Sequence, residues 1–80
     1  METGQVKRVT GLRQVTRAME QGVLLSVVIA EDADAPIKEA LIAKLQEANI
    51  PYEFVPSMKE LGQLCGINVG AAVMGRVQSA

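Results

Sequence analysis

The sequence predicts a single α/β domain in which one β-sheet lies between helices. Apolar runs typical of strands alternate with segments of helical periodicity, in the order β-α-β-α-β-α-β with short connections. The run 24–30 is almost continuously apolar and β-branched, which is typical of a strand covered on both faces. No repeat, linker or low-complexity segment interrupts residues 1–80, so we expect one domain over this range.

The first predicted strand and helix lie close together at the start of the chain. Residues 6–9 predict a short strand, and Thr10 is placed to cap a helix over 12–21. Gly22 can adopt the left-handed conformation that ends a helix. The positions i, i+3, i+4 and i+7 of this helix are expected to form its buried face: Leu12, Val15, Thr16 and Met19.

The second strand–helix pair is joined by an acidic turn. The strand 24–30 leads into this turn, and Pro36 suits the first position of a helix predicted over 36–48. Asn49 can close that helix. The buried stripe of the helix is expected to consist of Ile37, Ala40, Leu41, Leu45 and Ala48.

The last part of the chain predicts two further strands around one short helix. Residues 51–55 form the first of these strands. Ser57, with Glu60 three residues later, is a capping box that opens a helix ending before Gly66. After a short loop at 67–70, residues 71–77 are predicted to form the final strand.

The charge of the chain is balanced in total but polarised along the sequence. The formal net charge is −1, yet residues 1–17 are mainly basic and residues 31–53 mainly acidic. A polarised surface can bind nucleic acid on one face and repel it elsewhere. The alternative is a set of solvated helix faces. Tyr52 and Phe54 are the only aromatic residues, which argues against a stacking platform for single-stranded nucleic acid.

The composition disfavours an enzyme, and we expect neither a cofactor nor a metal. The chain has no histidine, and its one cysteine, Cys65, is expected to be a buried structural thiol. The acidic turn 31–34 lacks the glycine and the distal glutamate of a calcium loop. A lone thiol fits a reducing cytoplasm. The longest apolar run, 23–30, is too short to span a bilayer, so no membrane association is expected.

Two segments have the residue types that a nucleic-acid interface needs. Arg13, Gln14 and Arg17 lie on the polar side of the helix predicted at 12–21. Arginine can bind guanine O6 and N7 in a bidentate manner, and glutamine can both donate to and accept from base edges. The loop 67–72 is unusually apolar for a connection, so it is either tucked into the core or held out to touch a partner.

Four stretches of the chain together resemble the kink-turn-binding ribosomal protein family that includes the L-seven-Ae and L-thirty-e proteins, and its bacterial members most closely. The segment 11–18 is similar to the family's helix start, Gly-x-(Asn/Lys)-(Glu/Gln)-x-x-Lys. Residues 28–34 are similar to its strand and acidic turn, and residues 50–66 to its later signature. Val69-Gly70-Ala71-Ala72 is similar to its RNA-contacting loop.

This resemblance implies a fold and a function. The fold is a three-layer α/β/α sandwich with a mixed four-stranded sheet. The function is recognition and stabilisation of kink-turn or kink-loop RNA, a bent helix–internal loop–helix element with tandem sheared G·A pairs. The expected partners are structured RNA, ribosomal RNA among the candidates, and the ribosome, and the protein is expected to be monomeric without RNA. The alternative is a protein-interaction module of the same fold that lacks tight RNA binding.

The resemblance also assigns roles by position. The helix start reads guanines and adjacent phosphates, and the apolar loop covers an extruded base. Arg13 and Gln14 stand where archaeal members have Asn and Glu, Arg17 stands in place of Lys, and Gly70 replaces a common Pro. The residues with the first role are Arg13, Gln14 and Arg17, with Thr10, Gly11 and Lys7 or Arg8 nearby. Those with the second role are Val69, Gly70, Ala71 and Ala72.

Overall fold

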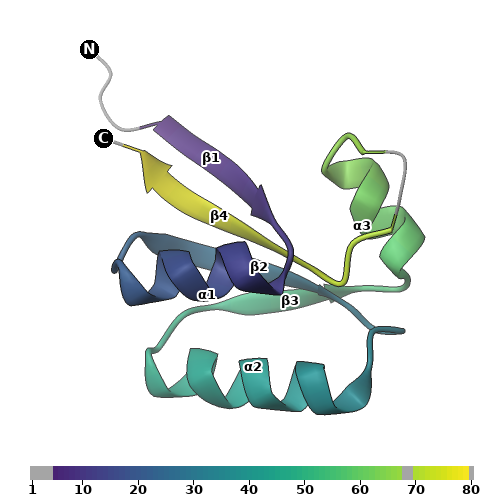
Figure 1. The fold of residues 1–80 in the computed structure, drawn as a ribbon, viewed down its shortest axis with the longest axis horizontal. Coiled ribbons are helices and arrows are strands. Elements are labelled where there is room, and N and C mark those ends of the chain that lie inside the picture. The colour runs from purple at the N-terminus through teal and green to yellow at the C-terminus, as the bar shows by residue number, and fades with distance from the viewer. Residues whose placement is uncertain (1–4, 68–69, 80) are drawn as a thin grey trace.

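A four-stranded sheet with helices on both of its faces forms the fold (Figure 1). The structure is a computed structural model, and it describes residues 5–67 and 70–79. The order of the elements along this part of the chain is the predicted alternation of strands and helices. The elements are β1 (Gln5–Thr10), α1 (Leu12–Glu20), β2 (Leu24–Ala30), α2 (Ala35–Glu47), β3 (Tyr52–Val55), α3 (Met58–Leu64) and β4 (Val73–Ser79).

The sheet is mixed, as the resemblance implies, and its strand order is β1-β4-β2-β3. The strand β4 lies between β1 and β2 and runs antiparallel to both, whereas β2 and β3 are parallel. The carboxyl ends of β1, β2 and β3 therefore meet at one edge of the sheet, which we call the carboxyl edge. The first residue of β4 lies at the same edge, because β4 runs in the opposite direction.

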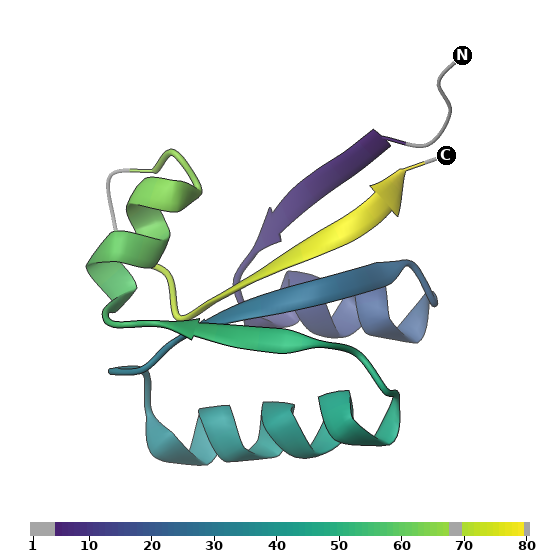
Figure 2. The same cartoon turned by 180° about the vertical axis from the view of Figure 1, so that it is seen from behind.

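Two separate apolar clusters hold the three layers together, which confirms the sandwich. The helices α1 and α2 pack on one face of the sheet, and α3 packs on the other (Figures 1 and 2). The larger cluster consists of Val15, Ala18, Leu24, Val27, Ile29, Leu41, Leu45, Val73 and Val77. The smaller cluster, under α3, consists of Val28, Ala30, Ala33, Leu61, Ala71 and Met74.

The helix α1 buries a narrower face than the sequence predicts. Val15 and Ala18 are buried, whereas Leu12 is 38% exposed. Thr16 and Met19 are half-buried. The prediction for Leu12 was wrong because this residue in the first turn points toward α2 rather than into the sheet, and no other element of the described structure covers it.

The start of α1 also differs from the prediction. The N-cap residue is Gly11 rather than Thr10, and no side chain caps the helix. Thr10 instead belongs to β1 and is paired with Met74 of β4. Gly11 has φ of 97°, in the left-handed region that disfavours residues with a side chain. A glycine is therefore required here by the backbone turn from β1 into α1.

The helix α2 is attached to the sheet by only two fully buried side chains, Leu41 and Leu45. The predicted stripe is wrong for three positions: Ile37 is 36% exposed, and Ala40 and Ala48 are also exposed. The pattern identified residues that share a helix face, but part of that face borders an open groove. The predicted closure is confirmed, since Asn49 has φ of 58°.

The boundaries of the remaining elements differ by one or two residues from the predictions. Pro36 is the second residue of α2 rather than the first. The strand β4 begins at Val73, because Ala71 donates instead to the carbonyl of Met58 in α3. Cys65 is half-buried against the cluster under α3, not fully buried as predicted.

The predicted cap of α3 is present and gives a test of stability. The Ser57 side-chain oxygen accepts a hydrogen bond of 3.1 Å from the backbone N–H of Glu60. We expect Ser57→Ala to lower the free energy of unfolding by about 1 kcal/mol, the usual value of such a cap. Urea denaturation measures this change. Ser57→Asp, which keeps a capping oxygen, is the matched control; an equal loss in both variants would contradict the capping role.

Candidate nucleic-acid interface

The carboxyl edge brings together segments that are about sixty positions apart in the sequence. The backbone N–H of Gly11 donates to the carbonyl of Val73 over 2.9 Å, which joins the start of α1 to the start of β4. The N–H of Ala30 donates to the carbonyl of Ala72, also over 2.9 Å. The fold thus places the predicted helix start beside the described part of the predicted loop.

The helix start presents two guanidinium groups and a carboxamide to solvent. Arg13, Gln14 and Arg17 are all exposed. Arg13 and Arg17 are four residues apart, so they lie on the same side of α1, where both border a shallow hollow. Neither forms an ion pair within the described residues, and the first turn of α1 contains no acidic residue. The positive end of the helix dipole and these cations together favour an anionic partner.

The described part of the loop, residues 70–72, is held tightly against α3. A side chain at Gly70 would approach the Cβ atom of Met58 to 3.2 Å, so the backbone of the loop lies close to this helix. Gly70 is exposed and Ala72 half-buried, but Ala71 is only 6% exposed and belongs to the cluster under α3. Of the predicted loop residues, Val69 lies outside the described residues.

The acidic turn has structural partners at the same edge. An Asp32 carboxylate oxygen accepts a hydrogen bond of 2.8 Å from the backbone N–H of Met58 at the start of α3. The Lys38 ammonium group donates to the carbonyl of Glu31 over 2.7 Å. These contacts fix the β2–α2 connection next to the loop. Across residues 5–67 and 70–79, no group of three potential metal ligands is found.

Apolar side chains around α3 enlarge the candidate interface beyond the residues that the sequence suggested. Met58 and Ile67 are each 37% exposed, and Leu64 is 51% exposed. Only Ile67 was singled out from the sequence, as part of the apolar loop. The short α3 buries Leu61 and Gly62 alone, so its other apolar residues stay accessible. Its length of seven residues was the signal that could have indicated this.

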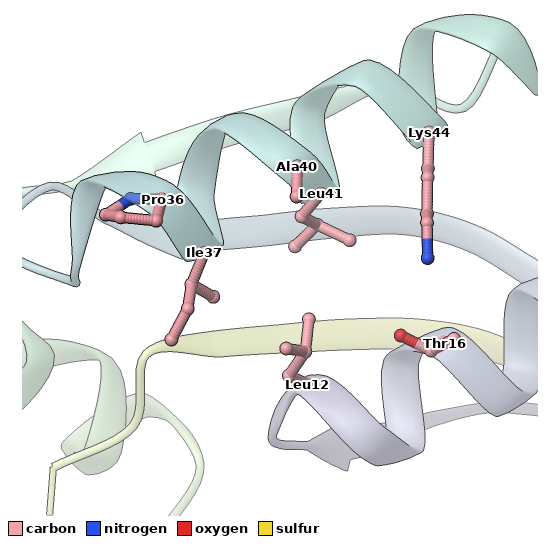
Figure 3. A pocket seen from close by; sticks show the side chains of 7 residues that line it. All are labelled: Leu12, Thr16, Pro36, Ile37, Ala40, Leu41 and Lys44. Carbon is pink, nitrogen blue, oxygen red and sulfur yellow. The ribbon is translucent and has the colours of Figure 1, made fainter.

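A groove between α1 and α2 lies beside the helix start. Its volume is about 250 Å³, and Leu12 from α1 faces Ile37 and Leu41 from α2 across it (Figure 3). Lys44 and Thr16 provide polar groups at one end. This groove accounts for three of the apolar residues that the sequence predicts as buried and that the structure leaves exposed: Leu12, Ile37 and Ala40.

The fold and this edge define a class: small α/β/α domains that present a basic helix start beside a tightly held loop of small residues. The chain belongs to the Ribosomal protein L7Ae/L30e/S12e/Gadd45 family, whose sequence profile matches residues 1–80. No helix in the described part of the chain is long and apolar enough to cross a membrane.

Several bacterial proteins are similar to this chain. RNA-binding protein YbxF of Geobacillus stearothermophilus is 48% identical over 68 residues, which cover 85% of this chain and 83% of that protein. A protein of Geobacillus thermodenitrificans named RNA-binding protein is similar to the same extent. A solved structure of a Bacillus halodurans protein of unknown function matches with a TM-score of 0.80 at 30% identity, covering 91% of this chain and 72% of that one.

Proposed function

We propose that this protein binds structured RNA at the carboxyl edge, and that its target is a kink-turn or kink-loop. The observation that carries the proposal is the Gly11–Val73 hydrogen bond, which places exposed Arg13, Gln14 and Arg17 beside the loop at 70–72. The names of the relatives, which describe RNA-binding proteins, support the same proposal.

The chemistry of the edge suits a bent RNA better than a straight one. An A-form helix hides its base edges in a deep, narrow groove that side chains cannot read, whereas a kink opens the helix and exposes them. Arg13 and Gln14 can then bond to base edges, and guanidinium groups can compensate phosphates that the bend brings close together. In this proposal, the surface of small residues at Gly70 and Ala72 covers an extruded base. The proposed function involves no catalytic step.

The family name includes ribosomal proteins, which makes ribosomal RNA the first target to test. A small basic region is sufficient for such a role in a chain whose net charge is −1, because the bound RNA touches only one edge. Sequencing of RNA crosslinked to the protein in cells would identify the natural target.

A titration against two RNAs tests the proposal. We expect a kink-turn RNA to bind more tightly than a straight duplex of equal length at the same salt concentration. Only a few phosphates are contacted at the edge, so the salt dependence of binding to a short kink-turn should be modest. A gel-shift assay measures both quantities, and equal affinities for the two RNAs would contradict kink recognition.

The groove between α1 and α2 favours a second candidate function, a protein-interaction module. Leu12 and Ile37 expose apolar surface there, on the side of the sheet opposite α3. If neither RNA binds, while Leu12→Ser and Ile37→Ser abolish capture of a protein partner, this second function replaces the first.

A further inference from the structure

The face of the sheet that α3 covers is only half covered. The helix α3 packs over Val28, Ala30 and Met74, near the carboxyl edge. Farther from that edge, no helix of the described part of the chain covers the strands β1, β4 and β2 on this side (Figures 1 and 2). On the same face, the positions two residues farther from the carboxyl edge are occupied by polar or charged side chains rather than apolar ones. These residues are Arg8 in β1, Ser26 in β2 and Arg76 in β4.

These three residues form one row across the sheet. Arg8 is the register partner of Arg76 in the β1–β4 pair, and Arg76 is the partner of Ser26 in the β4–β2 pair. Residues directly opposite each other on neighbouring strands point to the same face, so the two arginine side chains start side by side. Like charges in such positions repel, and a nearby anion relieves this repulsion.

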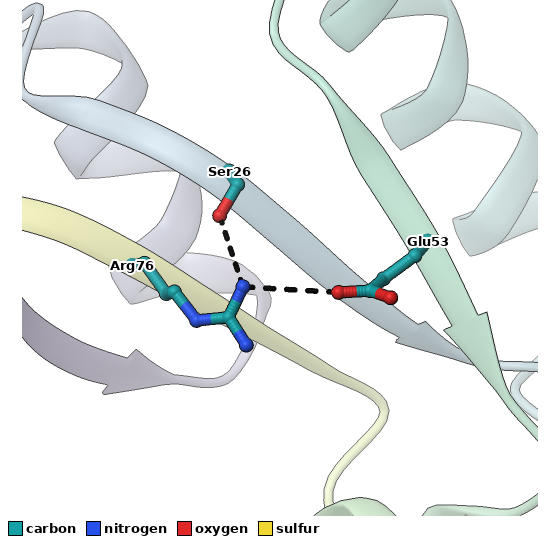
Figure 4. A network of polar contacts seen from close by, with 3 residues as sticks. All are labelled: Ser26, Glu53 and Arg76. Atoms are coloured by element: carbon teal, nitrogen blue, oxygen red, sulfur yellow. Dashed lines mark hydrogen bonds and ion pairs between the residues drawn. The ribbon is translucent and has the colours of Figure 1, made fainter.

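Among residues 5–67 and 70–79, the positive charge of this row is only partly compensated. An Arg76 guanidinium nitrogen lies 3.7 Å from a carboxylate oxygen of Glu53 and 3.4 Å from the hydroxyl of Ser26 (Figure 4). Arg8 donates to the backbone carbonyl of Leu64 at the end of α3. Each guanidinium has five donors, so both retain donors for another acceptor. The Arg76 side chain is 44% exposed and Arg8 is also exposed.

We infer that this row binds the phosphate backbone of a stem that flanks the RNA kink. The inference rests on the proposed function and extends the interface from the carboxyl edge along β1. Arg8 lies two residues before Thr10 on the same face of β1, about 7 Å from the edge. With Glu53 counted, the row has one net positive charge, whereas the whole chain has a net charge of −1. An RNA stem that continues beyond the carboxyl edge is therefore attracted to this face.

The stem is read through its backbone, not its bases. A straight A-form stem presents phosphates and hydroxyl groups on its surface and keeps its major-groove edges out of reach. The row should consequently add affinity without adding sequence preference. It should also make binding more sensitive to salt, because each phosphate contact releases counterions.

The test uses two kink-turn RNAs with the same kink and different stem lengths. The unmodified protein should bind the long-stem RNA several-fold more tightly and with a steeper dependence on salt. The double variant Arg8→Gln/Arg76→Gln should lose this advantage. The slope of log affinity against log salt should fall by about 1 for each phosphate that the variant no longer neutralises. Because Arg8 lies near the helix start, the single variant Arg76→Gln is used with the short-stem RNA, and its affinity for that RNA should be unchanged.

A second variant predicts a change in the opposite direction. Glu53→Gln removes the carboxylate that holds Arg76 and should tighten binding of the long-stem RNA. Lys44→Gln is the matched control for the arginine variants, because it also removes one exposed cation, on α2 at the other side of the sheet. Thermal melting followed by circular dichroism checks that each variant is folded. If the double variant unfolds, Arg76→Gln alone replaces it, with Arg76→Lys as the charge-preserving partner.

The outcomes separate this inference from the proposed function. Kink-turn selectivity without any stem-length advantage would overturn the role of the row and leave the kink site intact. The same holds if the double variant keeps the advantage, or if it weakens both RNAs equally. Loss of selectivity between kink-turn and duplex in the unmodified protein would overturn both.

Discussion

Replacement of Arg13 and Arg17 by alanine together should weaken kink-turn binding by at least about thirtyfold, the factor that roughly 2 kcal/mol represents at 25 °C. Each arginine that contacts a base edge contributes about 1–3 kcal/mol. Both side chains are exposed on one side of α1 and form no ion pair within the described residues. The weaker binding should therefore come from the RNA contact and not from unfolding.

The fold should tolerate this double substitution well. Exposed positions away from caps and networks usually change stability by less than about 0.5 kcal/mol, and alanine is the most favourable helix residue. Gel-shift titration and thermal melting of the same samples measure the two effects. Unchanged binding, or a large decrease in stability, would show that this side of α1 is not the RNA contact.

Arg13→Lys separates the two kinds of contact that an arginine can make. Lysine keeps the charge but cannot form the bidentate pair with guanine O6 and N7. If Arg13 reads a base, this variant should lose selectivity for the kink while keeping most of the weaker binding to a straight duplex. If it contacts only phosphate, the variant should behave like the unmodified protein.

Truncation of Leu45 to alanine should cost about 2–5 kcal/mol of stability, the range for large-to-small changes in a core. Leu45 is fully buried, and it is one of only two side chains that α2 buries completely or nearly so. A domain of this size has a total stability of about 4–12 kcal/mol, so the change removes a large part of it. Urea denaturation should show an earlier transition.

Ile37→Ala is the matched control for this prediction. It removes a side chain of similar size from the same helix, but Ile37 lines the groove and is 36% exposed. The decrease in stability should be below about 1 kcal/mol, because much of the side chain already contacts solvent. Equal decreases for the two variants would mean that the groove is closed in solution and that Ile37 is buried, as the sequence pattern alone predicts.

The elements of the fold could be predicted because their signals are local. The apolar run of β2, the capping box at Ser57 and the helix-ending Asn49 each depend on a few neighbouring residues. The strand order is different: β4 pairs with β1 and β2 over a large sequence separation, and no periodicity specifies that pairing. The mixed sheet followed from the family resemblance instead.

The exposure of Leu12 and Ile37 shows what a periodic pattern cannot determine. Spacing identifies the residues that share one side of a helix, but not whether another layer covers that side. The same limit applies at the candidate interface. The common exposed side of Arg13, Gln14 and Arg17 could be predicted, and their exposure agrees with it. The link from Gly11 to Val73 and the burial of Ala71 could not, because both depend on contacts between distant segments.

The position of β4 inside the sheet has a consequence for the time at which the interface forms. In the described structure, β1 pairs only with β4. These two strands are the first and the last of the described elements in sequence. A nascent chain that has not reached residue 73 therefore has no partner for β1 and no anchor for Gly11. The arginines of α1 are translated early, yet they acquire their neighbours at the carboxyl edge only when Val73–Ser79 has left the ribosome. Pairing between strands that are far apart in sequence is a slow step of folding. RNA recognition should therefore begin only after β4 has been translated.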